Sequence, residues 1–155
     1  MGRVLPGALR KCRVSVREVG QHAACPVRRL EVNVIYPQDP TPYPKDHRSR
    51  PIDPSLPDGG YAYVRDVNGT VHVIPDGPHV HPMILGGGLP AMYAGDMTIR
   101  RGRVVDLTNL SGTFQFDDED GLREVAAELR RQGFQVEIGA VRFFPADGST
   151  PVVLH

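Results

Sequence analysis

Three of the six histidines in this 155-residue chain lie within ten residues, at His72, His79 and His81. Histidine titrates near neutral pH and is the commonest metal ligand, so this cluster is the first candidate for chemistry. A two-residue turn at Asp76-Gly77 would place all three imidazoles on one face of a hairpin. Three converging neutral imidazoles could bind Zn, Fe or Cu, and these histidines are the set that would hold a metal.

The register of the hairpin at 61–74 bears on whether these histidines bind a metal. Asn68-Gly69 predicts a two-residue turn between strands at 61–67 and 70–74. Such a turn pairs Arg65 with His72, and a fixed cation beside a divalent metal is unfavourable. The register therefore favours acid–base chemistry without a cofactor over metal binding.

In an acid–base site, His79 or His81 would be the base and Arg65 would stabilise negative charge. A hydroxyl group, from Tyr63 or Ser111, would serve as proton donor or nucleophile.

Two further segments could bind a ligand through backbone or amide groups. The glycines Gly86, Gly87 and Gly88 follow directly after the histidines, and their amides could cradle an anion, although such a run also forms flexible turns. Asn109 and Ser111 either form a turn between strands or place polar side chains at a strand end.

The elements that must position these residues predict an α+β fold. Alternating apolar and polar residues indicate short strands, and acids before Leu122 with Gly133 at the far end predict one helix at about 119–132. We expect a bent antiparallel β-sheet of six to eight strands with this helix packed on it. The predicted strands are 12–19, 28–36, 61–67, 70–74, 97–100, 103–107, 112–116, 134–138 and 140–144.

Residues 37–60 differ in composition from the rest of the chain, because seven prolines fall within this stretch. Such a segment favours an extended loop, and a loop of this length is typical of a lid or a binding arm. We interpret residues 1–155 as a single domain that includes this Pro-rich arm or loop.

Composition excludes several classes of protein. The formal net charge is zero, so nucleic acid is an unlikely partner. The chain has no apolar run of membrane-spanning length, and its start lacks the apolar region of a signal peptide. We therefore expect no membrane contact, and either a cytoplasmic location or secretion through a specialised, signal-peptide-independent system.

Several short motifs carry a family resemblance. The order His81-Pro82, a Gly-rich turn, Ala94-Gly95-Asp96, Gly102 and Asn109-x-Ser111-Gly112-x-Phe114 is similar to a small domain in C-terminal regions of bacterial polymorphic-toxin and effector-like proteins. A related pattern occurs in plant calmodulin-binding IQ-motif proteins, which have Ser-Gly-His-Tyr where this chain has Ser111-Gly112-Thr113-Phe114. The resemblance covers about residues 61–154 and implies a toxin- or effector-type module.

Three functional hypotheses follow. The first is a small bacterial effector- or toxin-like enzyme, a hydrolase or transferase, with a histidine as acid or base. The second is a non-catalytic module that binds a protein partner through the Pro-rich arm and a sheet edge. The third is a metal-binding module built on the histidine cluster.

Overall fold

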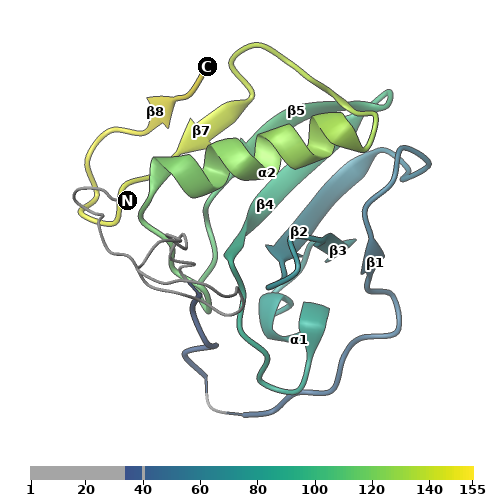
Figure 1. Ribbon diagram of the computed structural model, residues 1–155, viewed down its shortest axis with the longest axis vertical. Coiled ribbons are helices and arrows are strands. Elements are labelled where there is room, and N and C mark those ends of the chain that lie inside the picture. Colours follow the sequence, from purple (N-terminus) through teal and green to yellow (C-terminus); the bar gives the residue numbers. More distant parts are fainter. Residues whose placement is uncertain (1–33, 40) are drawn as a thin grey trace, which may run out of the picture. The chain divides into compact units, whose positions relative to one another are not determined.

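The computed structural model describes residues 34–39 and 41–155 (Figure 1). Residues 34–155 form one compact unit. The predicted strand at 12–19 and most of the one at 28–36 lie outside the described residues, so the single-domain prediction for the whole chain stays a prediction.

One sheet and two helices make up the unit. The spatial order of the main sheet is β1-β3-β2-β4-β5-β7-β8, and β6 pairs with β5. This architecture confirms the predicted α+β class. The elements are β1 (Arg50–Pro51), β2 (Gly59–Arg65), β3 (Val71–Pro75), α1 (His81–Leu85), β4 (Tyr93–Arg100), β5 (Arg103–Thr108), α2 (Glu119–Arg131), β6 (Gln135–Val136), β7 (Val141–Phe143) and β8 (Val152–Val153).

The predicted helix is α2, which lies across one face of the sheet in front of β4 (Figure 1). Its first turn is capped by the Asp118 carboxylate, which accepts a hydrogen bond from the Gly121 amide at 2.8 Å. Acids in the first turn and arginines in the last turn complement the helix dipole. The helix is held on the sheet by its apolar stripe, in which the buried residues are Leu122, Val125, Ala126 and Leu129.

The sheet is mixed, because β5 runs parallel to β6 and β7 while the other pairs are antiparallel. A helix that crosses the face of a sheet returns the chain in its original direction, so the strands on either side of α2 pair in parallel. The alternating pattern alone carries no information on strand direction.

The β2–β3 hairpin departs from the predicted register by one residue. Thr70 accepts a hydrogen bond from the Asp66 amide at 2.9 Å, and Gly69 has φ = 87°. The turn therefore has three residues and ends in a left-handed glycine, rather than two residues. His72 consequently lies opposite Val64, and the predicted pairing with Arg65 is wrong.

The slip moves His72 to the other face of the sheet. Strand residues directly opposite each other share a face, so His72 lies with Val64, whereas Tyr63 and Arg65 lie on the face that also carries Tyr93. The Tyr93 hydroxyl donates to the Asp118 carbonyl at 2.7 Å, so this second face is the one that α2 covers.

One hairpin that the sequence allows and one strand that it predicts are absent from the described part of the chain. No second hairpin follows β3, because the chain instead enters the short helix α1 at His81. Residues 112–116 form no strand; Phe116 stacks on Tyr93 with ring centroids 4.9 Å apart.

The Pro-rich segment is packed against the sheet over much of its length. Ile52 and Leu56 are buried in the core, and the Ile52 amide donates to the Val71 carbonyl at 2.9 Å. The Ser49 hydroxyl donates to the Ile84 carbonyl at 2.6 Å. The segment is thus a loop that covers the sheet next to β3, with β1 inside it.

Among the described residues, no helix combines the length and apolar character needed to cross a bilayer.

Candidate functional site

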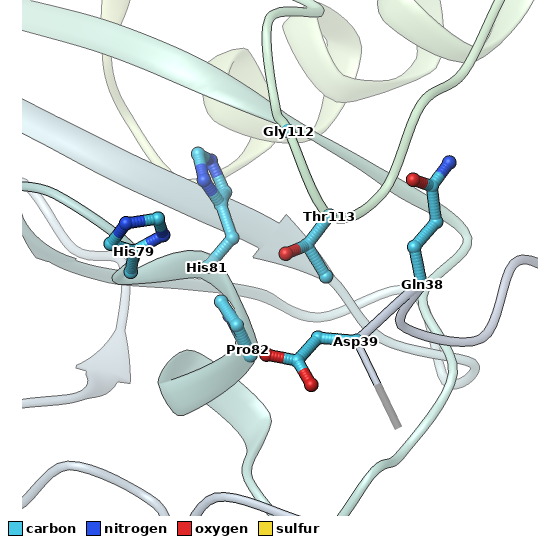
Figure 2. Close-up of a pocket in the computed structure, with 7 residues that line it drawn as sticks. All are labelled: Gln38, Asp39, His79, His81, Pro82, Gly112 and Thr113. Atoms are coloured by element: carbon cyan, nitrogen blue, oxygen red, sulfur yellow. The ribbon is translucent and has the colours of Figure 1, made fainter. Parts of the chain in front are cut away.

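A pocket of about 450 Å³ lies where three segments meet (Figure 2). The segments are 38–39, 79–82 and 112–113, and the first and last are joined by a hydrogen bond from the Gln38 amide to the Thr113 carbonyl at 3.2 Å. Ligand pockets in proteins span about 300–1,000 Å³, so a small molecule or one side chain fits this space. The lining residues are Gln38, Asp39, His79, His81, Pro82, Gly112 and Thr113.

His81 is a largely buried polar side chain of the pocket. It opens α1, and its Nε2 lies 2.8 Å from the Gly95 carbonyl oxygen. A carbonyl only accepts hydrogen bonds, so Nε2 carries the hydrogen and the basic lone pair of the neutral ring is on Nδ1. The side chain is 12% exposed, and this burial lowers the pKa of His81 although Gly95 and Asp76 oppose it. His81 is therefore a neutral base at pH 7.

Asp96 stands next to His81, with Oδ1 3.7 Å from Nε2. Burial raises the pKa of Asp96 to about 6, and the nearby carboxylates of Asp76 and Asp106 add to this rise. An imidazole of lowered pKa and a carboxyl of raised pKa therefore lie 3.7 Å apart. Such a pair suits proton transfer.

The sequence analysis did not select Asp96 as a site residue. A signal was present, since Asp96 is the single charged residue in the stretch 93–99, and aspartate is depleted in strands. The fold places it in the middle of β4, on the same face as Ala62.

His79 lines the same pocket from its exposed rim. Its φ of 56° lies in the left-handed region, which non-glycine residues seldom adopt. Figure 2 shows the His79 and His81 rings, the Thr113 side chain and the Asp39 carboxylate around a common space. The structure thus brings together the two histidines that the sequence analysis assigned as candidate bases.

The other three residues of the predicted acid–base site lie elsewhere. Tyr63 is fully buried on the α2 face, where its hydroxyl donates to the Thr108 carbonyl at 2.7 Å. Burial raises the pKa of Tyr63 well above its usual range. Arg65 shares that face and donates from Nε to the Gly69 carbonyl at 3.3 Å. Neither side chain lines the pocket of His81.

Ser111 lines a different and smaller pocket, of about 200 Å³, together with Asn109. Its hydroxyl oxygen accepts from the Phe114 amide at 3.1 Å. Asn109 is buried, and its side-chain amide donates to the Phe144 carbonyl at 3.0 Å while its oxygen accepts from the Phe144 amide at 2.7 Å. Its Nδ2 also donates to the Phe116 carbonyl at 2.9 Å. Asn109 therefore links the chain at Phe116 to the chain at Phe144.

The glycine run ends α1 and packs against the Pro-rich segment. The Gly86 amide donates to the Pro82 carbonyl at 3.2 Å, and the Gly87 amide donates to the Tyr43 carbonyl at 2.7 Å. Two of the three amides are therefore already paired with carbonyl oxygens rather than open to an anion. A side chain at Gly86 would clash with the Lys45 backbone, so this position needs glycine for the close approach.

His72 lies apart from the other two histidines of the cluster. Its Nε2 is 2.8 Å from Asp66 Oδ2, and Nδ1 is buried without a hydrogen-bond partner. Burial acts to raise the pKa of Asp66, but bonds from His72 and from the Thr70 and Asn68 amides hold it below its usual range. Within the described ranges, no group of three or more His, Cys, Asp or Glu residues is placed to hold a metal ion.

Comparisons with protein-family models, with curated proteins and with solved structures found no match.

Proposed function

We propose that this chain is a small enzyme, a hydrolase or transferase, in which His81 and Asp96 move a proton for a substrate bound in the pocket. One observation carries the proposal: the His81 ring lines the pocket while the Gly95 carbonyl fixes its tautomer and Asp96 lies 3.7 Å away. A general base that is neutral at pH 7, oriented by a backbone carbonyl and next to a carboxylate, is the arrangement that histidine catalysis requires.

The mechanism follows from the protonation states. His81 accepts a proton on Nδ1 from an attacking hydroxyl group or water, and the imidazolium that forms is stabilised by the Asp96 carboxylate. The same ring then returns the proton to the leaving group. At pH 7 about nine in ten Asp96 side chains are ionised if the pKa is about 6, so the stabilising charge is present.

Two hypotheses from the sequence, the effector or toxin role and protein binding, stand beside this proposal. The effector or toxin role depends on the resemblance of residues 61–154 alone. The protein-binding alternative would have to rely on a sheet edge such as β8, whose Val152 and Val153 are exposed, because the Pro-rich segment is packed against the core.

The test compares His81→Gln with His47→Gln, a matched control because His47 is 92% exposed and does not line the pocket. Hydrolysis of p-nitrophenyl esters, phosphodiesters and glycosides and of aminoacyl p-nitroanilides is measured for each variant. We expect His81→Gln to lose about 10²- to 10⁴-fold in rate and His47→Gln to keep the wild-type rate. Equal rates for both variants would refute the proposal.

A second measurement needs no substrate. Asp96→Asn removes the carboxylate beside His81, so the pKa of the His81 imidazole, followed by NMR, should fall. An unchanged His81 titration would show that the two side chains do not act as a pair.

A further inference from the structure

The walls of the pocket carry negative charge without a fixed positive counter-charge. Asp39 is the one acid among the seven lining residues, and none of the seven is Lys or Arg. Beyond the wall, Asp76 and Asp96 interact electrostatically with each other and Asp76 does so with His81. An anionic substrate group would therefore be repelled, whereas a cationic group would be attracted.

The Asp39 carboxylate is held in a defined orientation. Oδ1 accepts from the Thr41 amide at 2.9 Å, and Oδ2 accepts from the Tyr43 hydroxyl at 2.8 Å. These bonds also lower the pKa of Asp39, so the group is ionised at neutral pH. A carboxylate offers about four acceptor positions, so each oxygen keeps one for a ligand.

The backbone around Asp39 is fixed to the rest of the site. The backbone amide of the neighbouring Gln38 donates to the Thr113 carbonyl, and Ile35 exchanges two hydrogen bonds of 2.9 Å with Ala91. In Figure 2 the Asp39 carboxylate lies beside Pro82, on the side of the pocket away from Gln38's amide group. The acid is thus positioned in advance rather than being a freely moving surface group.

We propose that the pocket binds a primary ammonium or guanidinium group of the substrate, with Asp39 as its ion-pair partner. This inference rests on the proposed function, since it assigns the substrate class of the same site. A pocket of about 450 Å³ accommodates a group the size of a lysine or arginine side chain. Asp39 then fixes the cationic end while the bond to be attacked lies within reach of His81.

The experiment uses four probes of similar size that carry different head groups: n-butylammonium, n-butylguanidinium, butyrate and n-butanol. Binding to the full chain is followed by NMR shifts of the His79 and His81 imidazoles and the Thr113 amide. We expect the two cations to bind with millimolar dissociation constants and butyrate and butanol to bind at least fivefold more weakly.

Three variants separate charge from loop geometry. Asp39→Asn keeps an oxygen for the Thr41 amide but removes the charge, and should weaken cation binding about fivefold or more. Tyr43→Phe removes the hydroxyl and keeps the carboxylate, so it should retain binding. Asp147→Asn is the control, because Asp147 makes a similar bond to the Ser149 amide outside the pocket.

The inference is overturned if no probe binds, if butyrate binds as well as the cations, or if Asp39→Asn and Tyr43→Phe weaken binding equally. Failure of the proposed function would look different. In that case the cations still bind in an Asp39-dependent way, but His81→Gln hydrolyses the substrates at the wild-type rate.

Discussion

Replacing Asp96 with Asn should stabilise the folded protein at pH 7 while impairing the proposed proton transfer. Burial and two neighbouring acids raise the pKa of Asp96 from 3.8 to about 6, so the folded state disfavours the ionised carboxylate. Because the folded-state pKa lies above the unfolded value, this cost is absent below about pH 4, grows as the pH rises, and is complete above about pH 6. Asn has nearly the same shape and never carries the charge.

The magnitude follows from that difference in pKa. Each pKa unit corresponds to about 1.4 kcal/mol, so a rise from 3.8 to about 6 sets an upper bound of about 3 kcal/mol. The Asp96 side chain is 37% exposed, and solvent screening reduces the expected gain to about 1–1.5 kcal/mol. For a chain of this length, that gain raises Tm by about 3–6 °C.

The assay is thermal unfolding of the wild type and Asp96→Asn at pH 7 and at pH 4. The control is Asp120→Asn, because Asp120 is 96% exposed and its replacement should shift Tm by a degree or so at most. A gain at pH 7 that vanishes at pH 4 supports the assignment. A destabilised Asp96→Asn, or a gain of equal size at both pH values, would show that the burial of charge was misjudged.

Three further predictions concern the fold around the site. Gly95→Ala should cost several kcal/mol of stability, because its Cβ would overlap the Thr108 carbonyl oxygen; urea denaturation measures this. Asn109→Ala should cost about 3 kcal/mol in the same experiment, since the Phe144 backbone loses both of its partners in the buried side chain. Tyr63→Phe should lose about 1 kcal/mol but keep the full hydrolytic rate, because its hydroxyl bonds only Thr108 on the α2 face.

Each of these has a result that would contradict it. Gly87→Ala serves as the control for Gly95→Ala, since its Cβ would meet no neighbour and only its φ of 62° is unfavourable; a loss at Gly95 no larger than the loss at Gly87 would contradict the predicted overlap with Thr108. A stable Asn109→Ala would mean that water replaces the lost bonds. A Tyr63→Phe variant without activity would show that Tyr63 belongs to the catalytic site.

Local signals were sufficient for the helix and for most strands. The acids before Leu122, the apolar spacing and Gly133 act within a few residues of one another, and α2 spans Glu119–Arg131 as predicted. The hairpin shows the limit of such signals. Asn68-Gly69 marks the turn, but the choice between two and three loop residues was made by Asp66, whose carboxylate accepts from the Asn68 and Thr70 amides.

The shift of one residue in the β2–β3 register changed which residues can form the site. With a period of two along a strand, a slip of one residue moved His72 to the opposite face from Tyr63 and Arg65. Pro75 then ended β3, and the chain entered α1 instead of a second hairpin, which separated His72 from the other two histidines.

The local sequence pattern predicts an amphipathic helix at about 119–132 on a sheet of short strands, and it places His79 and His81 close together in one segment. Only the tertiary structure decided which groups join them. Asp96, 15 positions further along the chain, reaches His81, and Asp39 reaches the pocket from the Pro-rich segment. The pKa of a carboxyl depends on burial and on charges brought close by long-range packing, and neither can be predicted from the local sequence pattern.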